Sequence, residues 1–433
     1  MFTIFRNSDR YCDSVSRRSF LRVGGLAMGG LTLPRLLPAE AEAGAAARGK
    51  SVINIYLGGG PTHMDTFDLK PQAPVEFRGE LNPISTNVPG IQISEYLPKL
   101  ATMADDYAIV RSLTGVNNEH SPSQSDSGWP QKSLPSVGGH PGLGAVVSKM
   151  FGSMSGTVPT SMSLSGGFGK AGFLGAIHRP YDPGAMRSNL RLNGNMTLDR
   201  LGDRQALLGE LDRVRREADN RGAMTAMDAF TERAVGVVTS SKLADALEIN
   251  KEDPAIFEKY GYDRSKNRYR ENNRFLLARR LIEVGVRCVS FSWGGWDTHR
   301  NNFESMREQL PALDAGLSGL IADLKSRGML DDVIIMMSGE FGRTPRLNSN
   351  GGRGHGPEAS FCVLAGGGLS RGQGIGATNR LGEHAQDRPV HLQQVFATVY
   401  HQIGIDPETT TLIDPNGRPQ YLVQHRDPIH ALI

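Results

Sequence analysis

The sequence predicts an α/β protein, a three-layer α/β/α sandwich built on a mostly parallel sheet. First, short apolar segments rich in β-branched residues end in glycine turns, which is typical of buried strands. Second, these segments alternate with helical segments through residues 272–404, as in parallel sheets covered on both faces. Third, 433 residues of which 39% are hydrophobic can bury a sizeable core, which excludes a disordered, collagen-like or coiled-coil protein.

The first predicted strand covers residues 51–57, SVINIYL, and stops at a run of glycines. An apolar, β-branched run that meets a glycine turn indicates a buried strand. Four further segments have the same character and complete the predicted sheet: residues 108–113, 287–293, 333–337 and 360–365.

Four segments predict helices. Residues 272–284 have aliphatic side chains on one helical face, which indicates an amphipathic helix. Residues 310–327 predict a second helix, and Gly328 suits its C-terminal cap. Two more helices are predicted at residues 142–150 and 392–404.

The middle of the chain has a different character. Residues 152–193 are rich in Gly, Ser, Met and Pro and predict mostly loop. Residues 198–247 combine helical spacing with many charges and no proline, which predicts two or more helices. We therefore expect one domain, residues 44–433, with a helical insertion or cap at about 194–271. The sequence contains no internal repeat.

Residues 1–43 predict a twin-arginine signal peptide. Arg17 and Arg18 precede an apolar run at residues 23–33, which at about eleven residues is too short to span a bilayer. A small-residue stretch at 39–43 then resembles a cleavage site. The expected location is periplasmic or extracellular, with the twin-arginine translocase as a partner during export; an arginine-rich N-terminal helix is the alternative. No other segment predicts a membrane span.

Charge and cysteine content exclude several classes of protein. The chain carries 48 Lys and Arg against 45 Asp and Glu, and no basic run is interleaved with aromatic residues, so we expect no nucleic-acid partner. Its three cysteines are Cys12, Cys288 and Cys362, which excludes a disulfide framework and, without a CxxC pair, a thiolate zinc site. At most one bridge, between Cys288 and Cys362, is possible in the mature chain.

Polar side chains follow four of the predicted strands. In parallel α/β sheets ligands bind beyond the carboxyl ends of the strands, so we expect these groups to converge on one rim. A mixture of Asp, Glu and His without Cys suits zinc, manganese, magnesium or iron, and hydrolysis by a metal-activated water or hydroxyl. The candidates are Asp65, His120, Asp297, His299, Glu340, Arg343 and His355.

Each candidate also has an ordinary structural interpretation. Asp65 fits a helix N-cap, and Asp297 fits an Asx-turn beside an exposed histidine. Glu340 and Arg343 fit a local ion pair. The histidines at positions 120 and 355 lie in polar segments that fit surface loops.

Five segments carry a family resemblance. They are GGGPTHMDTFDLKP at 58–71, NNEHSPSQ at 117–124, GGWDTHRNNF at 294–303, GEFGRTP at 339–345 and GRGHGPE at 352–358. With a closing helix at 389–406, they resemble the DUF1501 family of exported bacterial proteins, in the alkaline-phosphatase/sulfatase-like superfamily. The resemblance implies an alkaline-phosphatase-like fold, two divalent metals with six protein ligands, and a Ser, Thr or formylglycine nucleophile. DUF1501 itself implies no activity.

The resemblance also implies roles for individual residues. Phe341 stands where a second imidazole ligand is expected, so the set is one imidazole short. This implies a single ion, or a second one held through His63 or His120. The ion is zinc, manganese, magnesium or calcium. The implied metal ligands are Asp65, Asp297, His299, Glu340 and His355.

The nucleophile is implied by its place in the loop at 114–123. Thr114, Ser121 or Ser123 attacks, or a metal-bound hydroxide does so directly. The arginine of the sulfatase loop is missing, because Gln124 follows Ser123. In this interpretation Arg343 holds an anionic ester oxygen and His120 contacts the substrate.

The predicted function is an exported, metal-dependent hydrolase of phosphate or sulfate esters, acting on a small-molecule or glycan ester. The alternative is a cell-envelope binding or structural protein that retains the fold without catalysis. A serine esterase using Ser370, within GLSRG at 368–372, is a third hypothesis. The glycine pattern at 167–172 lacks a preceding strand and a following helix, so a dinucleotide site is not predicted.

Overall fold

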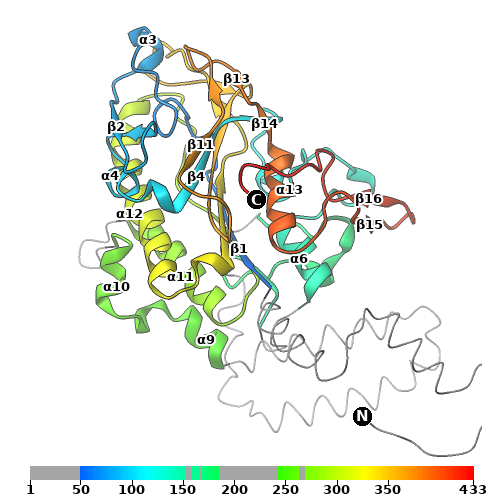
Figure 1. Cartoon of the computed structure of the whole chain (residues 1–433). Helices are drawn as coiled ribbons and strands as arrows, with labels where there is room; N and C mark the ends of the chain where they lie inside the picture. Colours follow the sequence, from blue (N-terminus) through cyan, green and yellow to red (C-terminus); the bar gives the residue numbers. More distant parts are fainter. Residues whose placement is uncertain (1–48, 153–157, 166–167, 185–240, 263–268) are drawn as a thin grey trace, which may run out of the picture. The chain divides into compact units, whose positions relative to one another are not determined.

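An eight-stranded mixed sheet organises the structure, a computed structural model that describes residues 49–152, 158–165, 168–184, 241–262 and 269–433 (Figure 1). The strand order is β11-β4-β10-β7-β1-β6-β5, and β14 also pairs with β4. The strands are β1 (Ser51–Tyr56), β4 (Tyr107–Thr114), β5 (Ser161–Ser163), β6 (Cys288–Ser292), β7 (Val333–Ser338), β10 (Ser360–Gly366), β11 (Gln373–Ile375) and β14 (Val390–His391).

Among the described strands of this sheet, only β10 runs against the others. It pairs antiparallel with β7 and β4, whereas the other pairs are parallel, which confirms the predicted mostly parallel sheet. The prediction that the strand at 360–365 is also parallel is wrong. Between β7 and β10 the chain forms only a short ladder of β8 (Gly342–Arg343) with β9 (His355–Gly356), and a parallel neighbour would need a long crossover.

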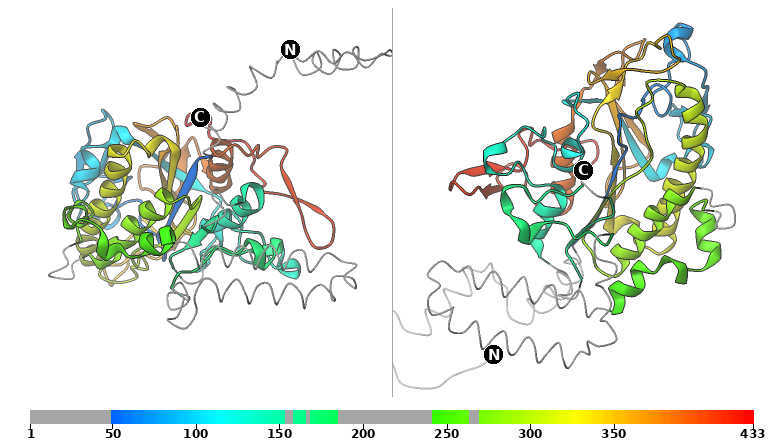
Figure 2. Two further views of the ribbon diagram at one scale, coloured as in Figure 1. Left: turned by 90° about the horizontal axis from the view of Figure 1, so that it is seen from below. Right: turned by 180° about the vertical axis from the view of Figure 1, so that it is seen from behind.

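Helices cover both faces of the sheet, which confirms the predicted three layers (Figures 1 and 2). The side chains of β1 point into two buried apolar clusters, one on each face of the sheet. Val52 packs into one cluster, and Ile53 and Ile55 pack into the other. This is the alternation expected of a strand buried on both sides. One face carries α4 (Pro98–Ala101), α11 (Asn273–Glu283) and α12 (Asn302–Ser326) with α9 (Ser241–Leu247) and α10 (Pro254–Lys259); the other carries α6 (Leu143–Phe151) and α13 (Leu392–Gln402).

The predicted elements are largely present, with two corrections. Helix α12 begins at Asn302 rather than at residue 310, and Pro311 lies inside it. Proline ordinarily marks a helix start, because it has no amide hydrogen to donate within the helix. Strand β5 falls in the segment 152–193 that was predicted as loop, since three residues, Ser-Met-Ser, are too few to show a pattern.

All of these elements belong to one compact unit, Lys50–Ile433. The predicted signal peptide lies outside the described residues, as does most of the predicted insertion at 194–271. Within the described part of that insertion the chain forms α9 and α10. No helix among the described residues is long and apolar enough to cross a membrane.

The bridge that the sequence allowed does not form. Cys288 and Cys362 are free and buried, on strands β6 and β10. Two strands, β1 and β7, lie between them, so about 14 Å separates the backbones at ~4.8 Å per strand. A disulfide needs Cα atoms less than ~7 Å apart.

A buried ionic network joins α11 to α12 on the α12 side of the sheet. The Nε atom of Arg279 lies 2.9 Å from Oδ2 of Asp323, and each side chain is 1% exposed. Tyr260 donates its hydroxyl to the same Asp323 oxygen at 2.9 Å, and Glu252 pairs with Arg279 at 2.8 Å. This network holds the helices together, and none of its residues lies in the loops that carry the predicted site residues.

We expect Phe291→Ala to destabilise the fold by about 3–5 kcal/mol, because it opens a cavity under the central helices. The Phe291 ring is 0% exposed and stacks edge-on against Phe275 at a centroid distance of 5.2 Å. Urea unfolding measures the loss. The control Val75→Ala, at a side chain that is 63% exposed, should change the free energy of unfolding by less than ~0.5 kcal/mol. Equal effects of the two substitutions would contradict this core.

Candidate functional site

Four side chains from three different loops meet at the carboxyl ends of β4, β6 and β7. They are His120, Asp297, His299 and His355, which we call the rim group. The potential ligand atoms of His120, Asp297 and His355 all lie within 4.8 Å of one another. Because β4, β6 and β7 point the same way, their ends share one rim, and this geometry brings together four of the predicted site residues.

Three atoms of the rim group form a nearly equilateral triangle. The Nε2 atom of His299 lies 3.0 Å from Oδ1 of Asp297 and 3.0 Å from Nε2 of His355, and the last two atoms are 3.2 Å apart. The Nε2 atom of His120 lies 3.8 Å from the second Asp297 oxygen. Ligands held at 2.0–2.1 Å by a tetrahedral zinc ion stand about 3.3 Å apart. The donor types and their spacing therefore fit a divalent metal ion.

The ring of His355 is oriented by Asn118. Its Nδ1 atom donates to the side-chain oxygen of Asn118 at 2.6 Å, which leaves the lone pair on Nε2 facing the triangle. Burial lowers the pKa of His355, and nearby Arg343 and His120 lower it too, although Asp297 opposes them. His355 is thus held as the neutral imidazole that metal binding requires. Asn118 lies in the segment NNEHSPSQ, but the sequence analysis did not select it.

Arg343 fixes the position of the Asp297 loop. It donates to Asp297 and to the backbone oxygens of Gly59, Gly60 and Arg353. Partial burial would raise the pKa of Asp297, but the hydrogen bond and the positive charge of Arg343 outweigh it and the pKa is lowered. The predicted role of Arg343 in holding an ester oxygen requires an accessible guanidinium, whereas the structure buries it and uses it within the protein.

Glu340 lies behind His120. Its two oxygens accept the amides of Gly59 at 2.8 Å and Gly60 at 3.2 Å, and both glycines have positive φ, which lets their amides turn inward. Nδ1 of His120 is 3.6 Å from the same carboxylate. Burial raises the pKa of Glu340, while the amides and the Tyr56 hydroxyl oppose the rise. The structure places this predicted ligand behind His120, with its carboxyl group bonded to two backbone amides.

Phe341 forms the wall between the two loop histidines. Its ring centroid lies 4.4 Å from that of His355 and 5.3 Å, edge-on, from that of His120. It is fully buried. The side chain that stands in place of an imidazole therefore packs against the rings of the rim group and adds no ligand atom.

Asp65 is the predicted ligand that the structure does not bring to the rim group. Both of its oxygens accept from Arg353, at 2.7 and 2.8 Å, and Oδ2 also accepts from Asn302 at 2.8 Å. His63, considered as the holder of a second ion, is buried and its Nε2 donates to the Gly382 oxygen at 2.7 Å. Its pKa is lowered by burial.

The three predicted hydroxyl nucleophiles have partners elsewhere. Thr114 donates to the Val390 oxygen at 3.2 Å. The Ser121 hydroxyl accepts the amide of Ser123, and the Ser123 hydroxyl accepts from Lys170 Nζ, each at 3.2 Å. Both serines are buried. Within the described part of the chain, none of the three hydroxyls is hydrogen-bonded to the rim group.

Lys170 is a polar residue that the sequence analysis did not select, although it lies in the glycine pattern at 167–172. Its side chain is exposed, and its amide and that of Gly169 both donate to Asp126 at 3.1 Å. Phe168 stacks on Tyr56, which is bonded in turn to Glu340. This loop is therefore fixed beside the site and presents a cation at its edge.

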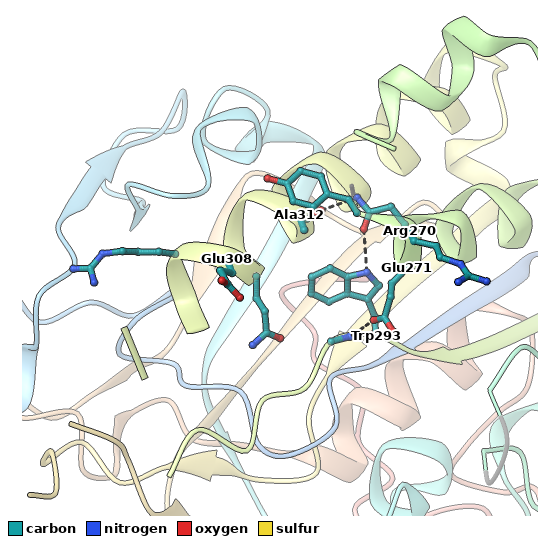
Figure 3. A pocket seen from close by; sticks show the side chains of 10 residues that line it. Arg270, Glu271, Trp293, Glu308 and Ala312 are labelled. Atoms are coloured by element: carbon teal, nitrogen blue, oxygen red, sulfur yellow. Dashed lines mark hydrogen bonds between the residues drawn. The ribbon is translucent and has the colours of Figure 1, made fainter. Parts of the chain in front are cut away.

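A surface pocket of about 490 Å³ is lined in part by Trp293 and Gly294, at the start of the loop that carries Asp297 (Figure 3). The amide group of Gln309 both donates to and accepts from the Gly295 backbone, at 2.9 and 3.0 Å. The loop that carries Asp297 therefore forms part of the pocket wall. Its lining combines two aromatic rings with planar polar groups and includes Tyr269, Arg270, Glu271, Trp293, Glu308 and Gln309.

Comparison with known protein families identifies the family of this chain. A family described as "Protein of unknown function (DUF1501)" matches residues 49–433. The chain belongs to the DUF1501 family. The predicted membership is thus confirmed, and no curated protein matches this DUF1501 chain.

Several solved structures show a distant likeness to this DUF1501 protein. The PsFucS1 sulfatase from Pseudoalteromonas sp. is 12% identical, with a TM-score of 0.40, over 86% of this chain and 71% of that one. The lipoteichoic acid synthase LtaP from Listeria monocytogenes is 11% identical, with a TM-score of 0.35, over 83% and 73%. The phosphonate monoester hydrolase of Agrobacterium radiobacter is 13% identical, with a TM-score of 0.30, over 82% and 74%. At these scores, no conclusion about function rests on the likeness.

We expect Asp126→Asn to remove a pH dependence of stability. Burial raises the pKa of Asp126 from 3.8 to about 6, although the amides of Lys170 and Gly169 oppose the rise. The folded state therefore holds this proton more tightly than the unfolded state. The contribution of protonated Asp126 to the free energy of unfolding is largest below pH 4 and is lost as pH rises through 6. Relative to the variant, the wild type should lose about 2.4 kcal/mol between pH 4 and 7.

Urea unfolding of both proteins at several pH values measures this difference. Asp331→Asn, at an exposed aspartate on the surface, is the matched control and should leave the pH profile unchanged. A constant difference between the wild type and Asp126→Asn across this range would contradict the assignment.

Proposed function

We propose that this protein binds one divalent metal ion in the rim group and hydrolyses phosphate or sulfate esters there. The triangle of Asp297, His299 and His355 carries the proposal, because its three atoms stand 3.0–3.2 Å apart. Three protein ligands with an open side are the usual arrangement of a catalytic metal site. The side chains of Asp297 and His299 are half-exposed, so a substrate can reach them.

The donor set favours zinc, manganese or iron, because imidazole nitrogens with one carboxylate suit these ions better than calcium or magnesium. His355, Asp297 and His299 would hold the ion, with His120 at the edge of the site. When bound, such an ion polarises an ester oxygen and lowers the pKa of a water molecule. Asn118 orients the ring of His355 toward it.

Recognition of an anionic ester requires a cation, and buried Arg343 is already paired with Asp297. Lys170 is the better candidate, because its side chain is exposed; its ammonium donates to the hydroxyl of Ser123 and also interacts electrostatically with Asp126. Asp126 fixes the backbone of Lys170. We assign the exposed ammonium of Lys170 to binding the charged ester group.

For the remainder of the substrate we propose a sugar, held in the pocket beside the Asp297 loop (Figure 3). A pocket of this volume falls within the range of small-ligand sites. Aromatic rings bind the apolar face of a sugar, and planar polar groups such as Arg270 and Glu308 bind neighbouring hydroxyls. The substrate class is therefore a glycan ester.

The location of this activity would be the periplasm or the cell exterior, after export by the twin-arginine translocase. Arg17 and Arg18 ahead of a short apolar run support this part of the proposal. Fusion of residues 1–43 to a reporter protein tests it. Export that survives replacement of both arginines by lysine would contradict it.

A non-catalytic envelope protein is the second candidate function. Two observations favour it: Phe341 adds no ligand atom, and the described hydroxyls of Thr114, Ser121 and Ser123 do not contact the rim group. A metal-loaded protein that turns over no aryl or sugar ester, but retains an envelope partner in a pull-down, would favour this function over hydrolysis.

We expect the purified protein, after zinc loading and dialysis, to retain about one ion per chain by elemental analysis. His355→Ala should lose the ion and the hydrolysis of 4-nitrophenyl phosphate or sulfate, because it removes one corner of the triangle. His430→Ala, at an exposed histidine that pairs with Asp427, is the matched control and should retain both. A folded wild-type protein that neither binds zinc or manganese nor gains activity from them would reject the proposal.

We expect Arg270→Ala and Glu308→Ala each to lower kcat/KM for glucose 6-phosphate or 6-sulfate by about tenfold, since each loses a hydrogen bond worth about 1–1.5 kcal/mol. Hydrolysis of the 4-nitrophenyl esters, which have no sugar, should be unchanged. Glu304→Ala, at an exposed residue of the same helix that does not line the pocket, is the control. Equal losses on both classes of substrate would contradict a sugar site.

A further inference from the structure

Asp65 is a buried carboxylate whose hydrogen bonds join three loops of the rim. It is 0% exposed and belongs to the loop after β1. Its two oxygens receive Nε and Nη2 of Arg353, at 2.7 and 2.8 Å, from the loop after β7. The oxygen Oδ2 also accepts Nδ2 of Asn302 at 2.8 Å, from the first residue of α12, which directly follows the loop after β6. Thr62 adds a hydroxyl donor at 3.0 Å. The carboxylate thus accepts four hydrogen bonds, three at Oδ2 and one at Oδ1, all from groups of the protein.

Each partner of Asp65 lies close to a corner of the triangle. Arg353 is two residues before His355 in the chain. Asn302 accepts the hydroxyl of Thr298 at 2.6 Å, and Thr298 stands between Asp297 and His299. Both loops are therefore hydrogen-bonded, directly or through Asn302, to Asp65 at points next to their ligand residues.

The same two loops are also joined directly. The amide of Arg353 donates to the Thr298 oxygen at 3.0 Å, and the amide of Asn302 donates to the Gly351 oxygen at 3.0 Å. Gly352 lies so close to the His299 backbone that an added Cβ atom would clash with it. Arg353 further donates to the backbone oxygens of Phe77 and Pro345. Its guanidinium is thus fixed on several sides, and a change at Asp65 would move both loops.

We infer that Asp65 is a positioning residue: through Arg353 and Asn302 it sets the separation of His355 from Asp297 and His299, and thereby the metal affinity of the rim group. This inference rests on the proposed function for its metal, but not for its geometry. Outer partners of metal ligands typically change affinity 10–100-fold when they are replaced. The Asp65–Arg353 pair differs in this from the Arg279–Asp323 pair, which is equally buried but joins two helices away from the rim.

The test replaces each of the two aspartates by asparagine. Asp65→Asn retains the shape of the side chain but turns an amide toward the donors of Arg353, so the loops should shift. We expect its dissociation constant for zinc, measured by competition with a chromogenic chelator, to rise 10–100-fold. Asp323→Asn is the matched control, and its dissociation constant should remain within twofold of the wild-type value, although its melting temperature falls.

A second measurement does not depend on metal binding. In the metal-free proteins, the NMR signals of the His299 and His355 rings should move in Asp65→Asn and stay in place in Asp323→Asn. Unmoved signals, or a wild-type zinc affinity in Asp65→Asn, would overturn the inference. A wild-type protein that binds no zinc would instead reject the proposed function, while moved ring signals would still support the positioning role.

Thr298→Val extends the test if Asp65→Asn does not fold. It removes only the hydroxyl that joins the Asp297 loop to Asn302 and has nearly the same shape. We expect a three- to tenfold weaker zinc affinity and moved signals of the His299 ring. An unchanged affinity together with unmoved signals would overturn the inference.

Discussion

The common direction of β4, β7, β1 and β6 determines where the polar side chains of the site meet. Because these strands point the same way, the loops that leave them gather at one edge of the sheet, however far apart they lie in the chain. Strand β10, the one reversed strand among those of this sheet that the structure describes, does not disturb this arrangement, since none of the polar segments of the site follows it. The apolar clusters on both faces stabilise the sheet and leave its edge free for polar side chains.

Much of this arrangement could be predicted from the sequence. The strands have short apolar runs and glycine ends, so their positions are clear, and the strand-end rule was sufficient to bring His120, Asp297, His299 and His355 together. The direction of β10 was not predictable in the same way, because it depends on how 339–359 folds back without a helix. Strand β5 is too short and too polar to show a strand pattern.

The roles of the charged residues were the least predictable part. Asp65, Glu340 and Arg343 stand at strand ends as expected, yet their settings depend on which partners the fold brings to them. Arg353, 288 positions from Asp65 along the chain, takes up both Asp65 oxygens, and Arg343 is surrounded by backbone oxygens and Asp297. A local pattern cannot distinguish a carboxylate that binds an ion from one that binds a guanidinium, since both need the same chemistry at the same strand end.

The two enclosed thiols give the folded chain a chemical property of its own. Burial raises the pKa of Cys288 and of Cys362 to about 12, so almost no thiolate forms near neutral pH. Oxidants and alkylating agents react with the thiolate, and neither sulfur is accessible while the sheet is intact. These two thiols are thus inert toward such reagents in the folded protein, and the rate at which an alkylating agent labels them reports how often the centre of the sheet opens.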